Sequence, residues 1–493
     1  MRVVAEFNDG WLFEGRTPVR LPHNAVELPY SYFDEKAYQR GFVYEKHFTS
    51  DPAWAGREVS LVFEGAMANA RVSLNGKVIG SHPDGYTPFE VRLTPHLTAG
   101  ENHLSVKIDG SENPAIPPFG GAIDYLTYAG IYRDVWLKIA APLSIHNVKI
   151  ETPEVLSKTK QVVARVELTD PQQLKLSGYI AATLLDAEGN KVAGESRLLS
   201  GTQVDIHFAD LEKIELWDID NPALYRLHLS LDTTAGTDEV TTRFGFRSVA
   251  FTTEGFRLNG KPLKLRGLNR HQSFPYSGYA MGKAAQERDA EILKNELKLN
   301  MVRTSHYPQS VHFLDRCDEL GLLVFEEIPG WQHVGDAVWQ AEAIENVRRM
   351  ITRDWNHPSI AIWGVRVNES GDYHDFYTAT NRLARELDST RPTGGVRYIT
   401  ESELLEDVYT MNDFFLGNEE LGGNRARTPL RPQQEVTGLD HLVPYLITEY
   451  CGHMYPTKSH DQEQRQAEHV WRHLQVLNAA CGDPQIAGCI GWC

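Results

Sequence analysis

Apolar and polar residues alternate along the first part of the chain, up to about residue 248. The segment ARVSLNGKVIG places Val72 and Leu74 between polar neighbours and then turns at Asn75-Gly76, a strong hairpin signal. HLSVKI, VVARVEL and LYRLHLSL repeat this period of two. Such a period predicts β-strands that bury one face. We therefore expect two all-β blocks. The second begins near Leu143 and, at roughly a hundred residues, has a length that suits an immunoglobulin-like sandwich.

The pattern changes after Phe251, where short apolar, β-prone runs alternate with stretches of helical spacing. Helices are expected over 283–299 and 461–480, in which apolar residues recur at helical intervals. Strands that alternate with helices favour a parallel sheet, and eight such units favour a (β/α)₈ barrel of about 250 residues. The eight expected strands are 264–269, 300–306, 322–328, 360–369, 393–400, 405–413, 444–450 and 486–493.

The chain stops at Cys493, at the end of the eighth expected strand. An eighth helix would normally cover apolar surface there. We therefore expect a barrel truncated after strand 8, with low solubility or forced oligomerisation. In such a barrel, residues at the strand ends would be correctly placed but poorly held.

Composition narrows the class of partner. The formal net charge of −17 argues against nucleic acid and anionic membranes, although solubility alone also explains it. The N-terminal segment MRVVAEFNDGWLFEG lacks the apolar core of a signal peptide, and no run reaches transmembrane length. The five cysteines show no CxxC spacing and are interpreted as reduced thiols. We expect a cytoplasmic protein; a secreted form without its signal is the alternative.

Two glutamates end predicted strands. Glu369 closes IAIWGVRVNE, and Glu449 closes PYLITE. In a (β/α)₈ barrel the C-terminal strand ends form the catalytic face. Strands four and seven lie across the barrel mouth from each other, so their end residues can converge. Two carboxylates about 5–5.5 Å apart are the pair that a retaining glycosidase needs.

Other polar residues end neighbouring strands. NMVRTSHYPQ places Arg303 and His306 at the end of the second strand, and Asn368 directly precedes Glu369. An arginine there can hold a carboxylate ionised, and a histidine can bind a sugar hydroxyl. An adjacent amide can hold the sugar 2-hydroxyl. From these residues alone, an ordinary buried polar network is an equally good interpretation.

These segments together resemble glycoside hydrolase family 2. NMVRTSHYP follows the family signature throughout, and the acid/base segment departs from it only at Ala361. FNDGWLF, DGYTPFEV and DYLTYAGIYRDVWL resemble the family's N-terminal jelly roll. The resemblance covers almost the whole chain. It implies a jelly-roll sugar-binding domain over 1–142, an immunoglobulin-like β-sandwich over 143–250 and a TIM-barrel catalytic domain over 251–493.

The resemblance also implies roles for single residues. Glu369 resembles the acid/base, Glu449 the nucleophile, and Arg303 the arginine that binds the nucleophile. The residues that resemble sugar ligands are Asn368 for the 2-hydroxyl, His271 and His306 in the −1 subsite, Asp124 on a jelly-roll loop, and Trp492 as a flat face for the pyranose. Without the resemblance, a turn-capping role for Asp124 and a core position for Trp492 would be preferred.

Three departures from the family pattern matter. Trp331 replaces a glutamate that binds magnesium in large β-galactosidases, although His333 is kept. A magnesium site is therefore doubtful, and we expect that no cofactor is required. The tyrosine near the nucleophile on the sixth strand is not evident, so Asn412 or a residue from elsewhere must serve. The Asn-x-Lys motif of family glucuronidases would lie after Cys493.

The function implied is a retaining exo-β-glycosidase that removes terminal non-reducing β-D-galactose. NRHQSFPYSGYAM and ITEYCGHMYPTK resemble family members with that activity most closely. The expected partner is a β-galactoside or a related oligosaccharide, without nucleic acid or membrane, in a possible homo-oligomer. A β-glucuronidase or β-galacturonidase is the alternative within the family. A truncated, non-catalytic carbohydrate-binding form and a purely structural scaffold are the alternatives outside it.

Overall fold

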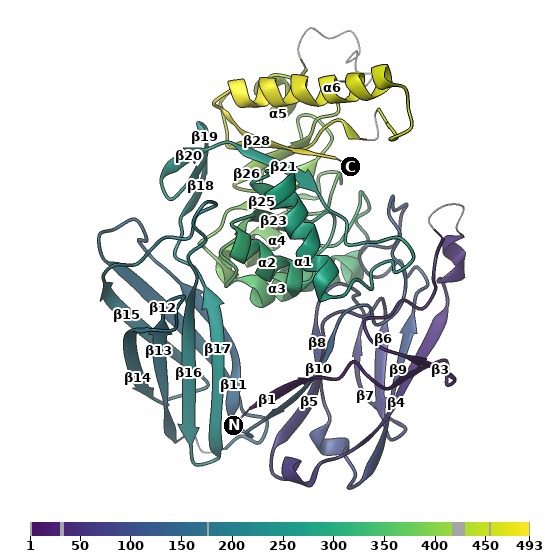
Figure 1. Cartoon of the computed structure of the whole chain (residues 1–493), viewed down its shortest axis with the longest axis vertical. Helices are drawn as coiled ribbons and strands as arrows, with labels where there is room; N and C mark the ends of the chain where they lie inside the picture. Colours follow the sequence, from purple (N-terminus) through teal and green to yellow (C-terminus); the bar gives the residue numbers. More distant parts are fainter. Residues whose placement is uncertain (1, 30–33, 175–176, 417–428, 453–454, 493) are drawn as a thin grey trace.

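Three regions make up the chain in a computed structural model (Figure 1). The structure describes residues 2–29, 34–174, 177–416, 429–452 and 455–492. Two all-β sandwiches lie side by side at one end, and an α/β barrel lies across both of them. The predicted fold class, two β-sandwiches followed by a TIM barrel, is confirmed.

The N-terminal region is a sandwich of two antiparallel sheets. The predicted hairpin joins β6 and β7, and its residues Asn75 and Gly76 have φ of 52° and 79°, the left-handed pair that a tight hairpin turn requires. The four-stranded sheet has the order β1 (Val3–Glu6), β10 (Val135–Ala140), β5 (Glu58–Phe63), β8 (Phe89–Arg92), and the six-stranded sheet has the order β3 (Thr17–Val19), β2 (Trp11–Phe13), β4 (Gly41–Thr49), β9 (Glu101–Asp109), β6 (Ala70–Leu74), β7 (Lys77–His82).

The second region is also a sandwich of two antiparallel sheets, followed by a small sheet that leads into the barrel. Phe256 and Leu258 of the small sheet pack with apolar residues of the barrel interior, among them Leu265, Met301 and Leu323 at the starts of three strands. The sheets are β11 (Ser144–Glu151), β12 (Lys160–Thr169), β15 (Gln203–Leu211); then β14 (Lys191–Leu198), β13 (Gly178–Leu185), β16 (Tyr225–Thr233), β17 (Gly236–Phe244); and the small sheet β18 (Val249–Thr252), β19 (Gly255–Leu258), β20 (Lys261–Leu263).

Eight parallel strands form the barrel at the positions that the sequence predicts, and all but the first end earlier than predicted. The ring is closed, because the last strand pairs with both the seventh and the first. The expected strand 360–369 ends at Arg366, so Glu369 lies in the loop beyond it. The strands are β21 (Leu265–Asn269), β22 (Met301–Arg303), β23 (Leu323–Glu327), β24 (Ile360–Arg366), β25 (Thr393–Arg397), β26 (Val408–Asn412), β27 (Tyr445–Glu449) and β28 (Ile486–Gly491).

Helices alternate with most of these strands. The helix expected over 283–299 ends as an α-helix at Glu291 and continues as a π-helical turn, Ile292–Glu296. The helix expected over 461–480 is present, but its Val470 and Trp471 are 59% and 58% exposed. The helices are α1 (Lys283–Glu291), α2 (Val311–Leu320), α3 (Ala337–Asp354), α4 (His374–Leu387), α5 (Gln433–Thr437) and α6 (Glu463–Gly482). Among the described residues, no helix is long and apolar enough to span a membrane.

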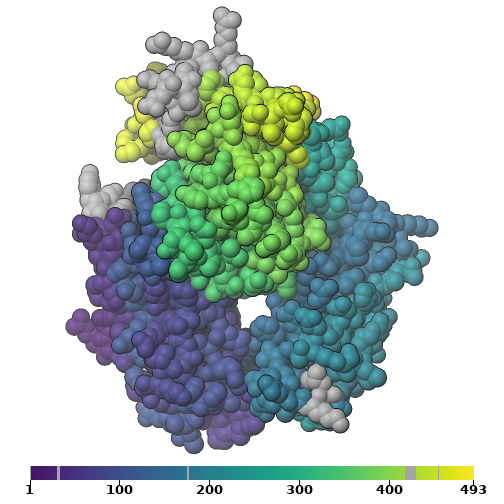
Figure 2. Space-filling model, turned by 180° about the vertical axis from the view of Figure 1, so that it is seen from behind, coloured from purple at the N-terminus to yellow at the C-terminus, as the bar shows by residue number. Residues whose placement is uncertain are grey.

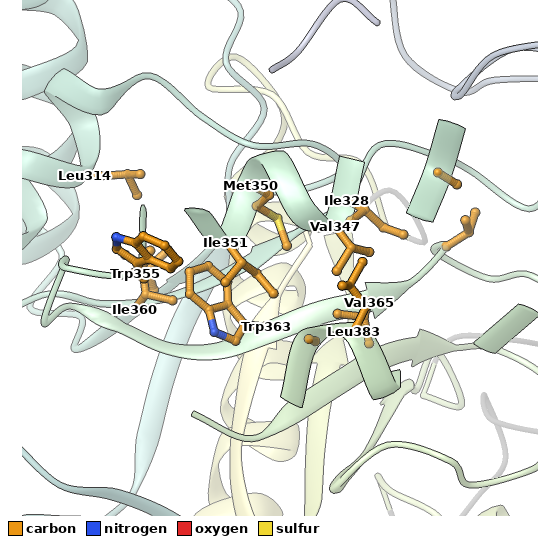
Figure 3. Packing of buried hydrophobic residues seen from close by; sticks show 14 of the residues in the cluster. Leu314, Ile328, Val347, Met350, Ile351, Trp355, Ile360, Trp363, Val365 and Leu383 are labelled. Atoms are coloured by element: carbon orange, nitrogen blue, oxygen red, sulfur yellow. The ribbon is translucent and has the colours of Figure 1, made fainter. Parts of the chain in front are cut away.

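The largest buried cluster lies between the strands and their covering helices. Figure 3 shows Trp363 of β24 beside Ile351 and Met350 of α3, with Trp355 and Ile360 nearby. All seven residues of β24 are buried, because helices cover its outer face and the barrel interior its inner face. This packing fixes the strand ends that carry the polar residues.

Polar and aromatic contacts join the three regions. An opening nevertheless separates the two sandwiches below the barrel (Figure 2). Arg2 pairs with the fully buried Asp238 of the second sandwich at 2.7 Å. Trp355 donates to the carbonyl oxygen of Val148 at 3.0 Å. The ring of Tyr86 from the first sandwich stacks on barrel Tyr307, 4.4 Å between centroids. The first sandwich is thereby held against the barrel mouth.

Candidate active site

A cavity of about 500 Å³ opens at the C-terminal ends of the barrel strands. Six of the nine candidate site residues line it. Of the other three, Arg303 and His271 contact members of these six, and Asn368 directly precedes Glu369. Its described lining is Asp124, His306, Trp331, Gln332, Glu369, Tyr398, Ile399, Thr400, Asn412, Phe414, Arg431, Glu449 and Trp492. Asp124 comes from the first sandwich, so the cavity is built by two regions of the chain.

Glu449, the last residue of β27, lines this cavity. Its side chain is only 4% exposed, and its Oε1 accepts a hydrogen bond from Arg303 Nη1 at 2.6 Å. Burial raises the pKa of Glu449 to about 8; the Arg303 guanidinium opposes the shift, and the nearby charge of Glu369 adds to it. The carboxylate is therefore poorly solvated and depends on one cation.

Arg303, the last residue of β22, is completely buried and binds several acceptors at once. Its Nε and Nη2 donate to Glu327 at 2.9 and 2.8 Å. Its Nη1 donates to Asn269 Oδ1 as well as to Glu449, and its Nη2 also donates to Asn368 Oδ1 at 2.8 Å. The planar guanidinium thus ties together the ends of five strands or of the loops that follow them.

Glu369 is held differently from Glu449. It is half-buried, and its backbone has φ of 54°, in the left-handed region that non-glycine residues seldom occupy. Its Oε1 accepts from Asn412 Nδ2 at 2.9 Å, and its Oε2 accepts from Gln332 Nε2 at 3.1 Å. Two neutral amides therefore orient this carboxylate.

Asn412 was expected to stand near Glu449 in place of a tyrosine. It is the register partner of Glu449 in the sheet, but its amide nitrogen points to Glu369. Its Oδ1 accepts from Thr448 Oγ1 at 2.9 Å, which fixes the amide in this orientation. Asn412 therefore links the strand that ends in Glu449 to the side chain of Glu369.

Aromatic and imidazole rings form one wall. His306 stacks on Trp492 with centroids 5.3 Å apart and planes at 19°, and His271 meets Trp492 edge-on at 5.6 Å. Burial lowers the pKa of both histidines well below the usual value, so both are neutral. Nε2 of His306 has no hydrogen-bond partner in the part of the chain that the structure describes. A buried imidazole nitrogen without a partner suits a ligand with hydroxyl groups.

Asp124 reaches the cavity from the loop of the first sandwich. The residue as a whole is exposed, but partial desolvation and then the charge of Glu369 raise the pKa of its carboxyl to about 6. The adjacent Tyr125 is packed against His271 and His306, at 5.2 and 5.7 Å between centroids. This contact anchors the loop where Asp124 can meet a ligand.

Two polar residues of the site were not singled out in the sequence. Gln332 binds Glu369 from the loop after β23, and Glu327 at the end of β23 binds Arg303 and His306. Glu327 shares the signal that identified the others, a charged residue closing an apolar strand. Gln332 stands in an irregular loop, where no periodic pattern indicates which way it points.

The residues around Glu369 do not fit a magnesium ion. Both of its oxygens receive amide N–H groups, and Trp331 offers no oxygen ligand. His333 packs against Gly120 and Gly121 instead, since a Cβ added at Gly120 would lie 2.4 Å from its Nε2. That the protein requires no magnesium stays a prediction.

A second group of possible metal ligands lies away from the cavity, at Asp315, Asp318 and His357. Arg243 already pairs with Asp315 at 2.6 Å. The neighbouring Asp318 raises the pKa of His357 to about 9 against the effect of burial, which leaves it protonated and unable to bind a cation. We interpret this group as an ion-pair network between the second sandwich and the barrel.

Comparisons with known proteins agree over the whole chain. Residues 249–478 match the model of the glycosyl hydrolases family 2 TIM barrel domain, residues 143–247 match glycosyl hydrolases family 2, and residues 23–141 match the family's sugar binding domain. The chain is 53% identical to a β-galactosidase of Rhizobium meliloti and 49% identical to one of Thermoanaerobacterium thermosulfurigenes, in both cases over 100% of the chain.

These relatives are longer than the chain, which covers 67% and 71% of their respective lengths. Among solved structures, a putative β-galactosidase from Bacteroides fragilis superposes with a TM-score of 0.85 at 25% identity, over 100% of the chain and 79% of that protein. A β-glucuronidase of Bacteroides uniformis superposes with 0.84 at 25% identity, over 100% of the chain and 64% of that protein.

Proposed function

The chain belongs to glycosyl hydrolases family 2, and from this premise we propose that it is a retaining exo-β-glycosidase of terminal β-D-galactosides. The observation that carries the proposal is the pair Glu449 and Glu369 in one cavity, one carboxylate buried against a guanidinium and the other half-exposed between amides. Two carboxylates in different surroundings can divide nucleophilic and acid/base work.

In the first step, Glu449 attacks the anomeric carbon while Glu369 donates its proton to the glycosidic oxygen. The bond to the leaving group breaks, and a covalent glycosyl–enzyme forms at Glu449. Arg303 positions Glu449 through its Nη1 donor and keeps a positive charge beside it. The anomeric carbon gains positive charge in the transition state, and the nearby carboxylates stabilise it.

In the second step, Glu369 takes a proton from water, and the water oxygen attacks the anomeric carbon. The bond to Glu449 breaks, and the sugar leaves with its original configuration. Glu369 must release and regain a proton in each cycle. Its half-exposed position between Gln332 and Asn412 supports this, because solvent can reach it while its orientation is kept.

The remaining residues suit a sugar ring. Asn368 uses its Oδ1 for Arg303, so its Nδ2 is left to donate to a hydroxyl. Trp492 offers a flat apolar face, which matches the apolar face of a pyranose. Asp124, His271 and His306 provide further polar atoms around that face.

A neutral glycone is favoured over a uronic acid. Three carboxylates, those of Asp124, Glu369 and Glu449, line the cavity. Among the described lining residues, Arg431 is the only lysine or arginine, and it already pairs with Asp413 at 3.4 Å. A sugar carboxylate would therefore meet a negative surface. The relatives near 50% identity carry the β-galactosidase label, whereas a β-glucuronidase of Bacteroides fragilis is 32% identical over 80% of the chain and 62% of its own length.

The test is a panel of nitrophenyl β-glycosides assayed with the wild-type protein and with Glu449→Gln. We expect hydrolysis of the β-galactoside to exceed that of the β-glucuronide by at least about tenfold, and Glu449→Gln to abolish it. Faster cleavage of the β-glucuronide would show that the proposed sugar is wrong but would leave the proposed mechanism in place. Galactose binding without any turnover of the panel would overturn the proposal in favour of a non-catalytic protein.

A further inference from the structure

Glu327 has no place in the two steps above, yet it lies in the centre of the site. It ends β23 and is 1% exposed. Side chains alternate along a strand, and Leu323 and Phe325 of β23 belong to the barrel interior, so Glu327 points inward as well. Glu326 points outward, where it meets Arg353 of α3 at 3.1 Å. A buried inward carboxylate that is neither acid/base nor nucleophile needs an explanation.

The hydrogen bonds of Arg303 can be counted completely. A guanidinium has five N–H protons. Nε donates to Glu327 Oε2, Nη1 donates to Asn269 and Glu449, and Nη2 donates to Glu327 Oε1 and Asn368, all between 2.6 and 2.9 Å. No proton of Arg303 remains for His306, although Nδ1 of His306 lies 3.0 Å from Nη2.

Nδ1 of His306 also lies 3.0 Å from Glu327 Oε1. A bare nitrogen lone pair would repel that carboxylate oxygen, whereas an Nδ1–H group donates to it. The ring is neutral, because burial first and Arg303 second lower the pKa of His306. With its single proton on Nδ1, the ring has a lone pair at Nε2, the atom that has no partner among the described residues.

We propose that Glu327 is a positioning residue that fixes His306 in the Nδ1–H tautomer, so that Nε2 must accept a hydrogen bond from a substrate hydroxyl. The proposal rests on the proposed function and refines its specificity. Asn368 offers a donor and His306 offers an acceptor. The site therefore distinguishes hydroxyl groups by the direction of their hydrogen bonds, and a ring substituent that can only accept is rejected at the position that meets His306.

The direct test uses nitrophenyl β-galactosides in which the hydroxyl at C3, C4 or C6 is replaced in turn by hydrogen or fluorine. Fluorine can accept weakly but cannot donate. We expect one position at which both replacements lower kcat/KM by about tenfold through the lost hydrogen bond, and at which His306→Ala removes this hydrogen-bond penalty. Inductive effects of fluorine act on both enzymes and cancel in that comparison. Retention of activity by the fluoro sugar at every position would overturn the proposal.

Glu327→Gln tests the positioning role. Its single carbonyl oxygen is needed by Arg303, so its amide nitrogen faces His306 and donates to Nδ1, which moves the ring proton to Nε2. The hydroxyl-to-fluoro ratio at the sensitive position is expected to fall toward one. Glu326→Gln is the matched control, and the ratio should stay at the wild-type value. An unchanged ratio in Glu327→Gln would contradict the role of Glu327.

The tautomer of His306 can also be measured in the wild-type protein, independently of Glu327→Gln. In wild-type protein with ¹⁵N-labelled histidine, the Nδ1 and Nε2 resonances of His306, assigned with His306→Ala, should show a protonated Nδ1 and a bare Nε2. A protonated Nε2 would overturn the proposal even if Glu327→Gln did not fold. If the galactoside itself is not cleaved, the proposed function fails separately, and the replacement series is made on the sugar that the enzyme hydrolyses.

Discussion

Glu449 and Glu369 line the same cavity, but their surroundings differ in charge, burial and backbone. Glu449 ends a regular strand, is 4% exposed and is bound by a guanidinium. Glu369 lies in a loop with φ of 54°, is half-buried and is bound by two neutral amides. Each environment suits one chemical role.

The difference follows from what each role demands. A nucleophile must be held in one place and must stay ionised at the moment of attack, and a fixed cation favours that form. An acid/base must change its protonation state twice in each cycle. Amide dipoles orient a carboxylate without the strong preference for the charged form that a cation imposes. At Glu449 burial disfavours the ionised carboxylate and Arg303 favours it, so the nucleophile depends on Arg303.

The largest effect is expected from removing that cation. Arg303→Met leaves Glu449 and Glu327 buried without their counter-ion, so kcat/KM for the nitrophenyl galactoside should fall on the order of 10³-fold or more. Arg303→Lys keeps the charge but loses the five-donor geometry and should recover only part of the activity. Circular dichroism and thermal unfolding serve as controls for folding. If Arg303→Met kept more than a tenth of wild-type kcat/KM, Glu449 would not depend on the cation, and the contrast between the two glutamates would fail.

Replacing the acid/base should give a smaller loss that depends on the leaving group. Glu369→Gln cannot donate a proton, so hydrolysis of lactose or a methyl galactoside should fall by about 10²–10³-fold. A dinitrophenyl galactoside, whose leaving group needs no proton, should form the glycosyl–enzyme at nearly the wild-type rate in a pre-steady-state burst. Equal losses of the first step for both kinds of substrate would show that Glu369 is not the acid.

The pH dependence of the wild-type enzyme should report the burial of Glu449. Since its pKa is raised to about 8, the ionised fraction falls as pH drops through that value, and kcat/KM should decline about tenfold per unit below it. Measurement of kcat/KM from about pH 5 to about pH 10 decides this. A profile that stays flat down to the ordinary glutamate range of about 4.3 would show that Glu449 is well solvated.

The raised pKa of Glu449 affects the free energy of unfolding in the opposite direction: activity rises with pH, whereas the stability contribution falls. A carboxyl whose pKa is higher in the folded than in the unfolded protein contributes stability that is fully present below the unfolded value and lost as pH rises through the folded one. The contribution of Glu449 should therefore decline between about pH 4.3 and about pH 8. Glu449→Gln should flatten that part of the stability profile in chemical unfolding, and an unchanged profile would contradict the shift.

The smallest effect is expected from the amides that orient Glu369. Gln332→Ala removes one neutral hydrogen bond, so kcat/KM on lactose should fall about three- to tenfold. Gln340→Ala is the matched control, because Gln340 of α3 makes a comparable 3.0 Å bond to the carbonyl oxygen of Gly335, away from the cavity lining. A loss in Gln332→Ala as large as in Glu369→Gln would mean that the amide does more than orient the carboxylate.

Much of the fold could be predicted because its signals are periodic. All eight barrel strands lie within their predicted ranges, since each is a short apolar run bounded by polar residues. The break at Ile292–Glu296, where α1 continues as a π-helical turn, was not predicted. Apolar residues continue at helical spacing through this segment, and the pattern cannot distinguish the two kinds of turn.

The candidate site was predictable where charged residues close strands. Glu369, Glu449 and Arg303 meet at one end of the barrel because parallel strands all end on the same side. Asp124 could be placed there only through the family resemblance, since its loop comes from another region. The sequence does not show that Gln332 turns back to Glu369, or which of Glu326 and Glu327 faces inward, because both depend on register and loop conformation.

Azide rescue tests the assignment of the two glutamates most directly. With an activated aryl galactoside, Glu449→Gly should regain activity in azide and release α-galactosyl azide, because azide attacks the face that Glu449 has left. Glu369→Gly should release the β-azide instead, because azide attacks the glycosyl–enzyme from the opposite face. Proton NMR of the anomeric coupling distinguishes the products. The β-azide from Glu449→Gly, or no rescue of that folded variant, would contradict the account.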